Sequence, residues 1–497
     1  MGVVPIAMSL IFSQISGIAL MGIPSDVYIY GSQFYIICIS IIIACVISSY
    51  VFLPVFFDLQ LTSIYEYLEL RFSPQVRVLA SVLFAITVLL YIPIVIYVPA
   101  LAFNQVSGVS IHLITTAVCI VCILYTMLGG LKAVVWTDFL QSFVTVGSCL
   151  TVITIGLWQL GGPQVVWRRS YEGGRLELFN MDPSPYVRSS FWTVTVGMTF
   201  AWLFSLAASQ EMVQKFISLP DIKSARRSLA IFCVGNITMK TVTVAIGLII
   251  FATYHDCDPV TTKKIKKIDQ ILPYYVMDTV ANVPGLPGLF NAGVFSASLS
   301  TLSSTMNCLS GTIYEDFIFP FIRENKRLQS RAHIILKITV VVIGLVCIAM
   351  VFIVERLGGV FEGALVGTIT SFLLMSWMSL GSQHAMASGS FSFPQLPLSV
   401  EGCDDFNRTQ SYDHKHQAES QLTNPDNSEV FILYRVSFML YSVFGTLMVL
   451  IVGLLVSWVT GFTDPDLLDQ RLIVPFMKKY VGKRLKDRIR PEEKVLL

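Results

Sequence analysis

The stretch Phe295-Ser-Ala-Ser-Leu-Ser-Thr-Leu-Ser-Ser-Thr-Met-Asn307 places seven hydroxyl side chains among thirteen residues of an otherwise apolar run. Serine and threonine are tolerated in lipid because each can bond back to a carbonyl of its own helix. A cluster this dense indicates a face that meets another helix, water or an ion. Neutral oxygen ligands suit a hard monovalent cation better than a transition metal. A small-residue face for helix packing would give the same pattern, so this stretch alone leaves both interpretations open.

The composition places the stretch in a polytopic membrane protein. The chain has 497 residues, of which 54% are hydrophobic and 13% charged, and its mean hydropathy is +0.69. The charged share is about half that of globular domains. Few alternating strand patterns occur, so we expect an all-α bundle of about eleven membrane spans, each long enough to cross ~30 Å of hydrocarbon. The apolar windows cover residues 3–23, 33–57, 78–103, 110–128, 137–160, 192–213, 229–253, 284–313, 333–354, 359–382 and 430–460.

Lysine and arginine in the short loops set the orientation, because basic residues accumulate on the cytosolic side. The loops at 58–77, 214–228 and 314–332 are basic, whereas those at 24–32 and 104–109 carry no basic residue. If the first helix runs outward, all three basic loops face the cytosol.

The end of the chain conflicts with this count. The segment 461–497 is strongly basic and should also be cytosolic, yet three apolar windows separate it from the basic loop 314–332. An odd number of crossings cannot return the chain to its starting side. Either one window does not cross the membrane or a span is absent.

The cysteines indicate no metal site. Eight of the ten lie in expected spans, where they are small apolar fillers. Cys257 and Cys403 fall in polar loops and could form a disulfide if both loops are extracellular. No CxxC motif outside the expected spans and no Cys/His cluster suggests a metal site.

The first window has the features of a discontinuous helix. Glycine and proline loosen the helical ladder and free carbonyl groups, and many transporters coordinate ions at such breaks near the bilayer midplane. A kinked structural helix would look the same. The polar and helix-loosening residues of this window are Ser9, Ser13, Gln14, Ser16, Gly17, Gly22 and Pro24.

Asp138 stands at the start of the fifth window, where a carboxylate is costly unless it is paired, hydrated or serving an ion. Gln141 lies three residues further on and shares its face. A helix cap favoured by the helix dipole is the alternative interpretation of Asp138. Gln210, Glu211 and Gln214 close the sixth window and are typical of a polar border at the cytosolic interface.

Five blocks of sequence together resemble the sodium–solute symporter family, in particular the animal branch of sodium-coupled monocarboxylate, multivitamin and iodide transporters. The resemblance runs in order through residues 1–383 and 430–460. It implies a LeuT-type fold of two inverted five-helix repeats around a midplane site. The blocks are Gly22-Ile-Pro-Ser-Asp-Val-Tyr-Ile-Tyr-Gly31, Thr62–Phe72, Gly129–Gln141, Val213-Gln-Lys-Phe216, and Pro284–Phe290 running into Ser296–Asn307.

The resemblance also implies where sodium and substrate bind. Ser300 and Thr301 match hydroxyl ligands on the eighth core helix, while Ala297, Phe12 and Ile15 match carbonyl ligands. A carboxylate and an amide on the fifth helix match positions associated with sodium passage or binding, namely Asp138 and Gln141. The residues expected in the substrate cavity are Gln14, Gly17, Ala19 and Gln33.

The chain departs from the family in three respects. Family members usually carry an extra helix ahead of the core, whereas this chain begins at the first core helix. Around residues 357–363 the lead into the tenth core helix runs directly into the start of the following helix, as if about one span were lost. Ala19 replaces a polar residue of the iodide branch, which argues against halide transport.

The expected organisation is a transporter core (1–383), a polar and extracellular loop (384–429), a last membrane helix (430–460) and a basic cytoplasmic tail (461–497). Asn407 begins an Asn-Arg-Thr sequon in the polar loop, and only an extracellular loop can be glycosylated.

We therefore predict a plasma-membrane, sodium-coupled symporter for a small organic anion, such as a monocarboxylate or a vitamin-like carboxylate. The alternative is a non-transporting sensor or regulatory relative that keeps the fold, since a core helix is missing from the pattern. An enzyme is not expected because the sequence offers no catalytic cluster. The expected partners are sodium, the anion and the lipid bilayer, with no nucleic acid and no organic cofactor.

Overall fold

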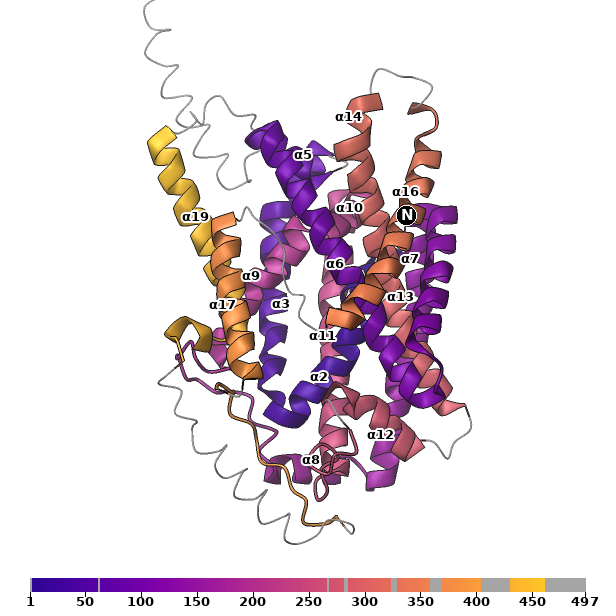
Figure 1. The fold of residues 1–497 in the computed structure, drawn as a ribbon, viewed down its shortest axis with the longest axis vertical. Coiled ribbons are helices and arrows are strands. Elements are labelled where there is room, and N and C mark those ends of the chain that lie inside the picture. The colour runs from indigo at the N-terminus through magenta and orange to yellow at the C-terminus, as the bar shows by residue number, and fades with distance from the viewer. Residues whose placement is uncertain are drawn as a thin grey trace, which may run out of the picture.

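The structure is a computed structural model, and its helices run between two ends of the molecule (Figure 1). The part of the chain that it describes is helical and contains no β-strand, as the sequence predicts. The described residues are 2–60, 63–265, 268–280, 285–322, 329–357, 369–388, 390–403 and 430–460.

The helices of this bundle are α1 (Val3–Gln14), α2 (Gly17–Tyr30), α3 (Ile37–Ile47), α4 (Leu53–Leu59), α5 (Ile64–Arg71), α6 (Pro74–Ser107), α7 (Ile111–Leu160), α8 (Pro163–Glu172), α9 (Phe191–Leu203), α10 (Gln210–Ile217), α11 (Ile222–Thr253), α12 (Ile271–Val280), α13 (Leu286–Thr312), α14 (Phe319–Ile322), α16 (Ala332–Leu357), α17 (Ile369–Ala387) and α19 (Tyr441–Thr460). Shorter helical turns that matter below are η1 (Ser32–Ile36), η3 (Phe204–Ala208) and η5 (Ile313–Ile318).

The first expected span consists of two helices with a bend of 58° between them. Ile15 leaves the helical conformation after α1, and Ser16 is extended. The Ser16 side chain accepts a hydrogen bond from the Ala19 amide (3.3 Å) and so caps α2. Pro24 lies inside α2. The expected discontinuous helix is therefore present, and a serine cap marks the break.

α7 contains the fourth and fifth expected spans, joined by a sharp reversal. Gly130 has a φ of +54°, a left-handed value that favours glycine. Tyr125 donates to the Leu299 carbonyl (3.1 Å), and Thr145 donates to the Gly293 carbonyl (3.1 Å). On a straight helix Tyr125 and Thr145 would lie ~30 Å apart, whereas their partners on α13 are only ~9 Å apart. The two halves of α7 are therefore antiparallel and cross the bilayer twice.

Six helices in the described part of the chain are long and apolar enough to span a membrane, or seven if α1 and α2 form one bent span. Two physical reasons make this number smaller than the eleven windows. The reversal within α7 joins two crossings in one continuous element, and the hydroxyls of α13 lower its hydropathy. The described parts of the last two windows hold α17 and α19.

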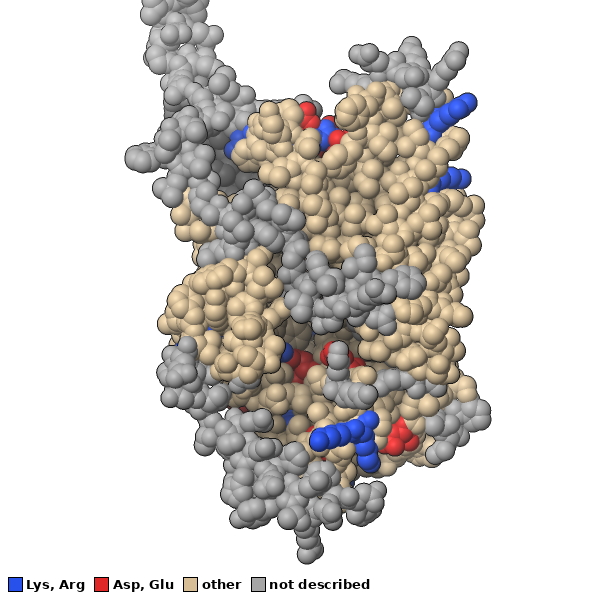
Figure 2. Space-filling view, in the orientation of Figure 1, with Lys and Arg blue, Asp and Glu red and all other residues tan. Residues whose placement is uncertain are grey.

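The basic loops meet at one end of the molecule, as the distribution of lysine and arginine predicts. The Ile64 amide donates to Gln210 Oε1 (2.6 Å), and Arg77 forms an ion pair with Asp316 (2.6 Å). α5, α10 and α14 lie at this end, and α8 and α12 lie at the opposite end (Figure 1). On the face drawn in Figure 2, charged side chains gather toward the two ends and leave a broad, mostly uncharged region between them. The end with α5, α10 and α14 is thus cytosolic.

A disulfide joins Cys257 and Cys403 at the outer end, across 146 residues of sequence. It fixes the segment 390–403, which also rests on α2, where the Leu396 amide donates to the Ile29 carbonyl (3.1 Å). The pairing that the sequence left open is therefore present. The other eight cysteines are free thiols, and all but one are buried.

α16 and α17 both run from the cytosolic end outward. α16 follows α14 at the cytosolic end (Figure 1). In α17, Trp377 packs on Tyr434 (ring centroids 5.2 Å apart), and Gly381 further along the helix lies against the same ring. Ser437, close to Tyr434 in sequence, donates to the Arg188 carbonyl (2.7 Å) in the outer loop before α9. Successive membrane spans normally alternate in direction, and α16 and α17 do not. The helix directions therefore show the same mismatch as the count of apolar windows.

The structure refines two expected boundaries. The last membrane helix begins at Tyr441, and residues 432–440 before it contain two short 3₁₀ turns. α17 extends to Ala387, so the polar loop starts after it. Asn407, the basic tail 461–497 and most of the interval 357–363 lie outside the described residues.

Removing the disulfide should destabilise the outer end. We expect Cys257→Ser/Cys403→Ser to lose roughly 2–4 kcal/mol of unfolding free energy, because the crosslink closes a long loop in the unfolded chain. Thermal unfolding of the purified protein in detergent measures this as a lower Tm, with the free thiol variant Cys233→Ser as the control. An unchanged Tm in the double variant would contradict the pairing.

Candidate functional site

α13 carries the hydroxyl-rich stretch through the bundle, where it packs against α1, α6, α7 and α16. Six of the seven serines and threonines in the stretch 295–307 are buried. Some hydroxyls bond back along the helix: Ser303 Oγ donates to the Ser300 carbonyl (3.2 Å), and Thr305 Oγ1 donates to the Thr301 carbonyl (2.6 Å). Helix packing therefore accounts for part of the stretch.

Gly17 brings the start of α2 directly against α13. A Cβ atom at this position would overlap Ser298 Oγ and would lie 3.3 Å from the Val294 carbonyl oxygen. A larger residue would push the broken helix away from α13. Because residue 17 has no side chain, the break in the first span can lie directly beside the buried hydroxyls of α13.

Thr301 connects α13 to the break. Its Oγ1 lies 3.2 Å from the Ser13 carbonyl oxygen and 3.2 Å from the Ala297 carbonyl oxygen. A hydroxyl has one proton, so it can donate to only one of these carbonyls at a time. Phe12 and Ile15, on either side of the contact in sequence, are buried. Thr301 Oγ1 and the carbonyl oxygens of Ser13 and Ala297 therefore lie close together. The resemblance to the family predicts a sodium ion in this region.

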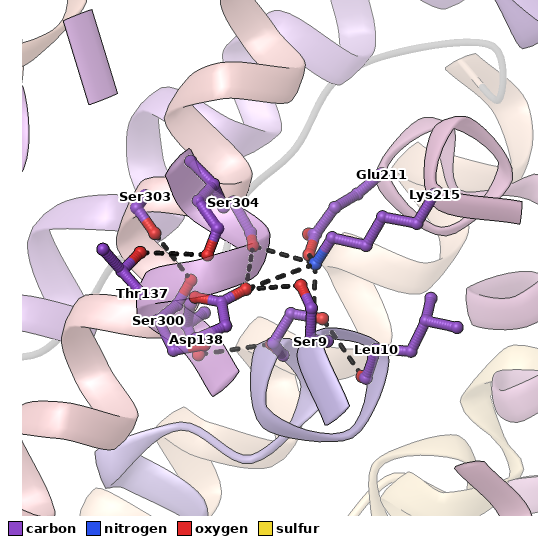
Figure 3. Close-up of polar contacts among 12 residues, drawn as sticks. Ser9, Leu10, Thr137, Asp138, Glu211, Lys215, Ser300, Ser303 and Ser304 are labelled. Carbon is purple, nitrogen blue, oxygen red and sulfur yellow. Dashed lines mark hydrogen bonds and ion pairs between the residues drawn. The ribbon is translucent and has the colours of Figure 1, made fainter. Parts of the chain in front are cut away.

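Asp138 forms a buried polar cluster beside this contact (Figure 3). Its Oδ2 accepts hydrogen bonds from Ser9 Oγ (2.5 Å) on α1 and Ser304 Oγ (3.1 Å) on α13. Lys215 Nζ of α10 lies 3.8 Å from the same oxygen and 3.2 Å from Glu211 Oε1. The side chains of Asp138 and Lys215 are 0% and 1% exposed. Four helices thus meet at one carboxylate.

Several buried oxygens near these contacts have no hydrogen-bond partner among the described residues. They include Asp138 Oδ1, Gln141 Oε1 and Ser300 Oγ. Burying an oxygen without a partner is costly. A neutral hydroxyl, an amide oxygen and a carboxylate form a donor set that fits a hard monovalent cation.

The structure excludes one of the two interpretations of Asp138 and changes the setting of Lys215. Asp138 lies well inside the second half of α7, eight residues after Gly130, so it is not a helix cap. Lys215 contributed to the basic character of loop 214–228 in the sequence, but it is buried on α10, one helical turn after Glu211. Lys223 on α11 is exposed, so the cytosolic orientation still holds. The i, i+4 spacing of Glu211 and Lys215 was the available signal of an ion pair.

A cavity of about 840 Å³ opens between the break and the cytosolic end. Ser13, Gln14 and Thr301 lie at its inner limit, and Glu211 also lines it. Apolar and aromatic side chains of α5 and α6 make up much of its wall, among them Ile64, Tyr65, Leu68, Phe84 and Tyr91. The break is therefore accessible from the cytosolic side in this conformation.

Of the four residues expected in the substrate cavity, Gln14 lines this one. Its Oε1 accepts a hydrogen bond from Ser205 Oγ (3.2 Å) on η3. Ala19 packs against the apolar cluster of α2 and α11, and Gln33 lies on η1. Ala19 and Gln33 thus lie on the outer side of the break, away from the cytosolic cavity.

The chain matches the profile of the "Sodium:solute symporter family" over residues 1–380. It is 37% identical to the human "Sodium-coupled monocarboxylate transporter 1", with 95% of this chain and 83% of that protein aligned. It is 33% identical to the rabbit (Oryctolagus cuniculus) "Sodium-dependent multivitamin transporter", with 97% and 80% aligned. The structure of a Na⁺-coupled sialic acid symporter superposes with a TM-score of 0.69 at 21% identity, over 92% of this chain and 90% of that one.

Fold and site together define a multi-pass membrane transporter of the LeuT type, with a broken first helix facing a hydroxyl-rich eighth core helix. The chain belongs to the sodium:solute symporter family. It is a sodium-coupled symporter of the plasma membrane, and its relatives are transporters.

Lys215 is the counter-ion of both Asp138 and Glu211, so its removal should destabilise the protein. Lys215→Met should lower the unfolding free energy by about 3–5 kcal/mol in sodium-free buffer, because Asp138 and Glu211 lose their shared counter-ion. Sodium should recover more stability in this variant than in the wild type, since an ion binding the native state stabilises it. Tm measured in detergent across a NaCl series against choline chloride tests both effects.

Lys223→Met removes an exposed lysine of the same end of the bundle and is the matched control. If Lys215→Met and Lys223→Met respond equally to sodium, Asp138 is not accessible to the ion.

Proposed function

We propose that this symporter carries a small organic anion, such as a monocarboxylate or a vitamin-like carboxylate, into the cell together with sodium. The substrate class is supported by the relatives, which are named as transporters of monocarboxylates and vitamins. The coupling is supported by one structural observation, the contact of Thr301 with the carbonyls of Ser13 and Ala297 at the break.

Sodium would bind between α1 and α13. Hydroxyls of Ser300 and Thr301 and the carbonyl of Ala297 would come from α13, and carbonyls of Phe12 and Ile15 would come from the end of α1. Asp138 and Gln141 would provide a second place for the ion on its way through the protein. An ion shared by two helices favours the conformation in which both are in contact, and such coupling is typically worth ~1–3 kcal/mol in substrate affinity.

The cavity supports a direction for release. It runs from Thr301 and Gln14 to the cytosolic helix α5, so ions and substrate would leave on that side. Glu211 lines this route and also holds Lys215.

We further infer that one crossing is absent between α16 and α17. Both helices run outward, and the interval 358–368 is shorter than the ~20 residues that a crossing helix needs. The alignment with the human relative extends over 516 positions, more than the 497 residues of this chain, so the relative has residues without a counterpart here. Sequencing the transcript across residues 357–365 tests this inference. No finding favours the non-transporting alternative.

The loop 384–429 would be extracellular, as the outer position of residues 390–403 supports. Asn407 would then carry a glycan, and residues 461–497 would form a cytoplasmic tail.

Uptake measurements test the proposed function. Cells expressing the chain should accumulate labelled propionate in sodium medium and lose this uptake when choline replaces sodium. Ser300→Ala/Thr301→Ala should raise the sodium concentration for half-maximal uptake at least about tenfold, which corresponds to losing ~1.4 kcal/mol of ion binding. The control variant is Thr238→Ala on the exposed face of α11. Uptake that is equal in sodium and choline would refute the symporter for this substrate class.

A further inference from the structure

A lysine lies on α11 at the level of the break in α1–α2. Gly235 of α11 packs against the Ile11 side chain of α1, and a Cβ on Gly247 would lie 3.0 Å from the Pro24 carbonyl oxygen of α2. Lys240 is between these two glycines. Because Ile11 precedes the break and Pro24 follows it, Lys240 is close to the bilayer midplane, where transporters of this architecture bind their substrates.

Lys240 is on the inward face of α11. The exposed face carries Ile231 (37% exposed) and Val234 (66% exposed) together with Thr238. Residue 240 is on the opposite side of the helix, one turn after the fully buried Asn236. The side chain of Lys240 is nevertheless partly exposed. Lys240 therefore points toward the neighbouring helices of the bundle and not toward the exposed side of α11.

No oxygen partner holds the ammonium group of Lys240. Among the described residues, no carboxylate lies within 4.0 Å of Nζ and no hydrogen bond from Nζ forms. The fully buried cations behave differently: Lys215 has Asp138 and Glu211, and Arg175 donates to the carbonyls of Tyr28 and Gly173. An ionisable side chain inside a membrane bundle is costly and normally has a specific partner. Lys240 is therefore a candidate to bind an anion from outside the chain.

Asn236 is the second observation that points to a ligand. Its side chain is 0% exposed, and neither Oδ1 nor Nδ2 has a hydrogen-bond partner among the described residues. Asn236 and Lys240 are four residues apart, so their side chains share one face of α11. An ammonium group and an amide N–H on one face are the donors that a carboxylate requires.

We propose that Lys240 and Asn236 bind the carboxylate of the transported anion. Lys240 Nζ supplies the positive charge, and Asn236 Nδ2 donates a hydrogen bond. This inference rests on the proposed function and names the residues that recognise its substrate class. Sodium bound at α13 and the anion bound at α11 would face each other across the broken helix.

The anchor is separate from the cytosolic cavity. That cavity reaches Ser13 and Gln14 but not Lys240. The anion would therefore bind at Lys240 and Asn236 before it passes into the cavity.

Transport kinetics of substituted chains test the anchor. Lys240→Gln should raise the KM for propionate at least about tenfold, because a charge-assisted contact is lost. Lys240→Arg should keep the KM within about threefold of the wild type, since the charge remains. Propionamide, the neutral isostere, should inhibit the wild type far less than propionate does, and Lys240→Gln should lose this discrimination. Lys337→Gln, at an exposed position of α16, is the matched control.

Asn236→Asp provides an independent variant. Its carboxylate would lie one turn from Lys240 and would occupy the ammonium group, so propionate affinity should again fall at least about tenfold while the protein keeps its counter-ion. Sodium activation should stay within about twofold of the wild type in both Lys240→Gln and Asn236→Asp, a result that general misfolding would not give.

The outcomes separate the two proposals. No sodium-dependent propionate uptake in the wild type refutes the proposed substrate class. Wild-type uptake with an unchanged KM in Lys240→Gln or Asn236→Asp refutes the anchor alone. If Lys240→Gln does not reach the cell surface, the KM of Asn236→Asp and of Lys240→Arg decides.

Discussion

The bundle depends on one constraint: inside a bilayer, every polar group must find its partner within the protein or in a bound ion. Breaking the first helix at Ile15 and Ser16 releases backbone groups where water is scarce. α13 provides hydroxyl groups at the break, and Thr301 donates a hydrogen bond to the Ser13 carbonyl across the helix contact. The break and the hydroxyl-rich stretch are therefore two halves of a single arrangement, and neither would be stable in lipid without the other.

The same constraint explains the position of the charges. Asp138 is tolerated because Ser9, Ser304 and Lys215 surround one of its oxygens. The other oxygen, Oδ1, has no partner among the described residues. A buried ion pair of this kind adds little net stability, since desolvation offsets most of the attraction. It does hold α1, α7, α10 and α13 in one relative arrangement, which suits a protein whose helices move against each other.

Much of the fold follows from local rules that the sequence displays. Window length gives the spans, and basic loops give the orientation. The density of hydroxyls singles out the stretch 295–307, and the resemblance to the family singles out Ser300 and Thr301 within it. The burial of Lys215 could not be predicted, because hydropathy treats a lysine after an apolar window as the start of a loop. The sequence also could not predict that the side chains of Asn236 and Lys240 lack a partner among the described residues. Whether a polar residue within a span has a partner depends on neighbouring helices, which no single segment encodes.

The close contact of Gly17 with α13 has a mechanical consequence. It fixes the bent first span at its middle, so α1 and α2 act as two lever arms of about 18 Å and 21 Å, at 1.5 Å of rise per residue. A shift of about half an ångström a few ångströms from this fulcrum becomes a displacement of several ångströms at the ends of the arms. Adjusting a few oxygens around one ion would then be enough to open one end of the molecule while closing the other.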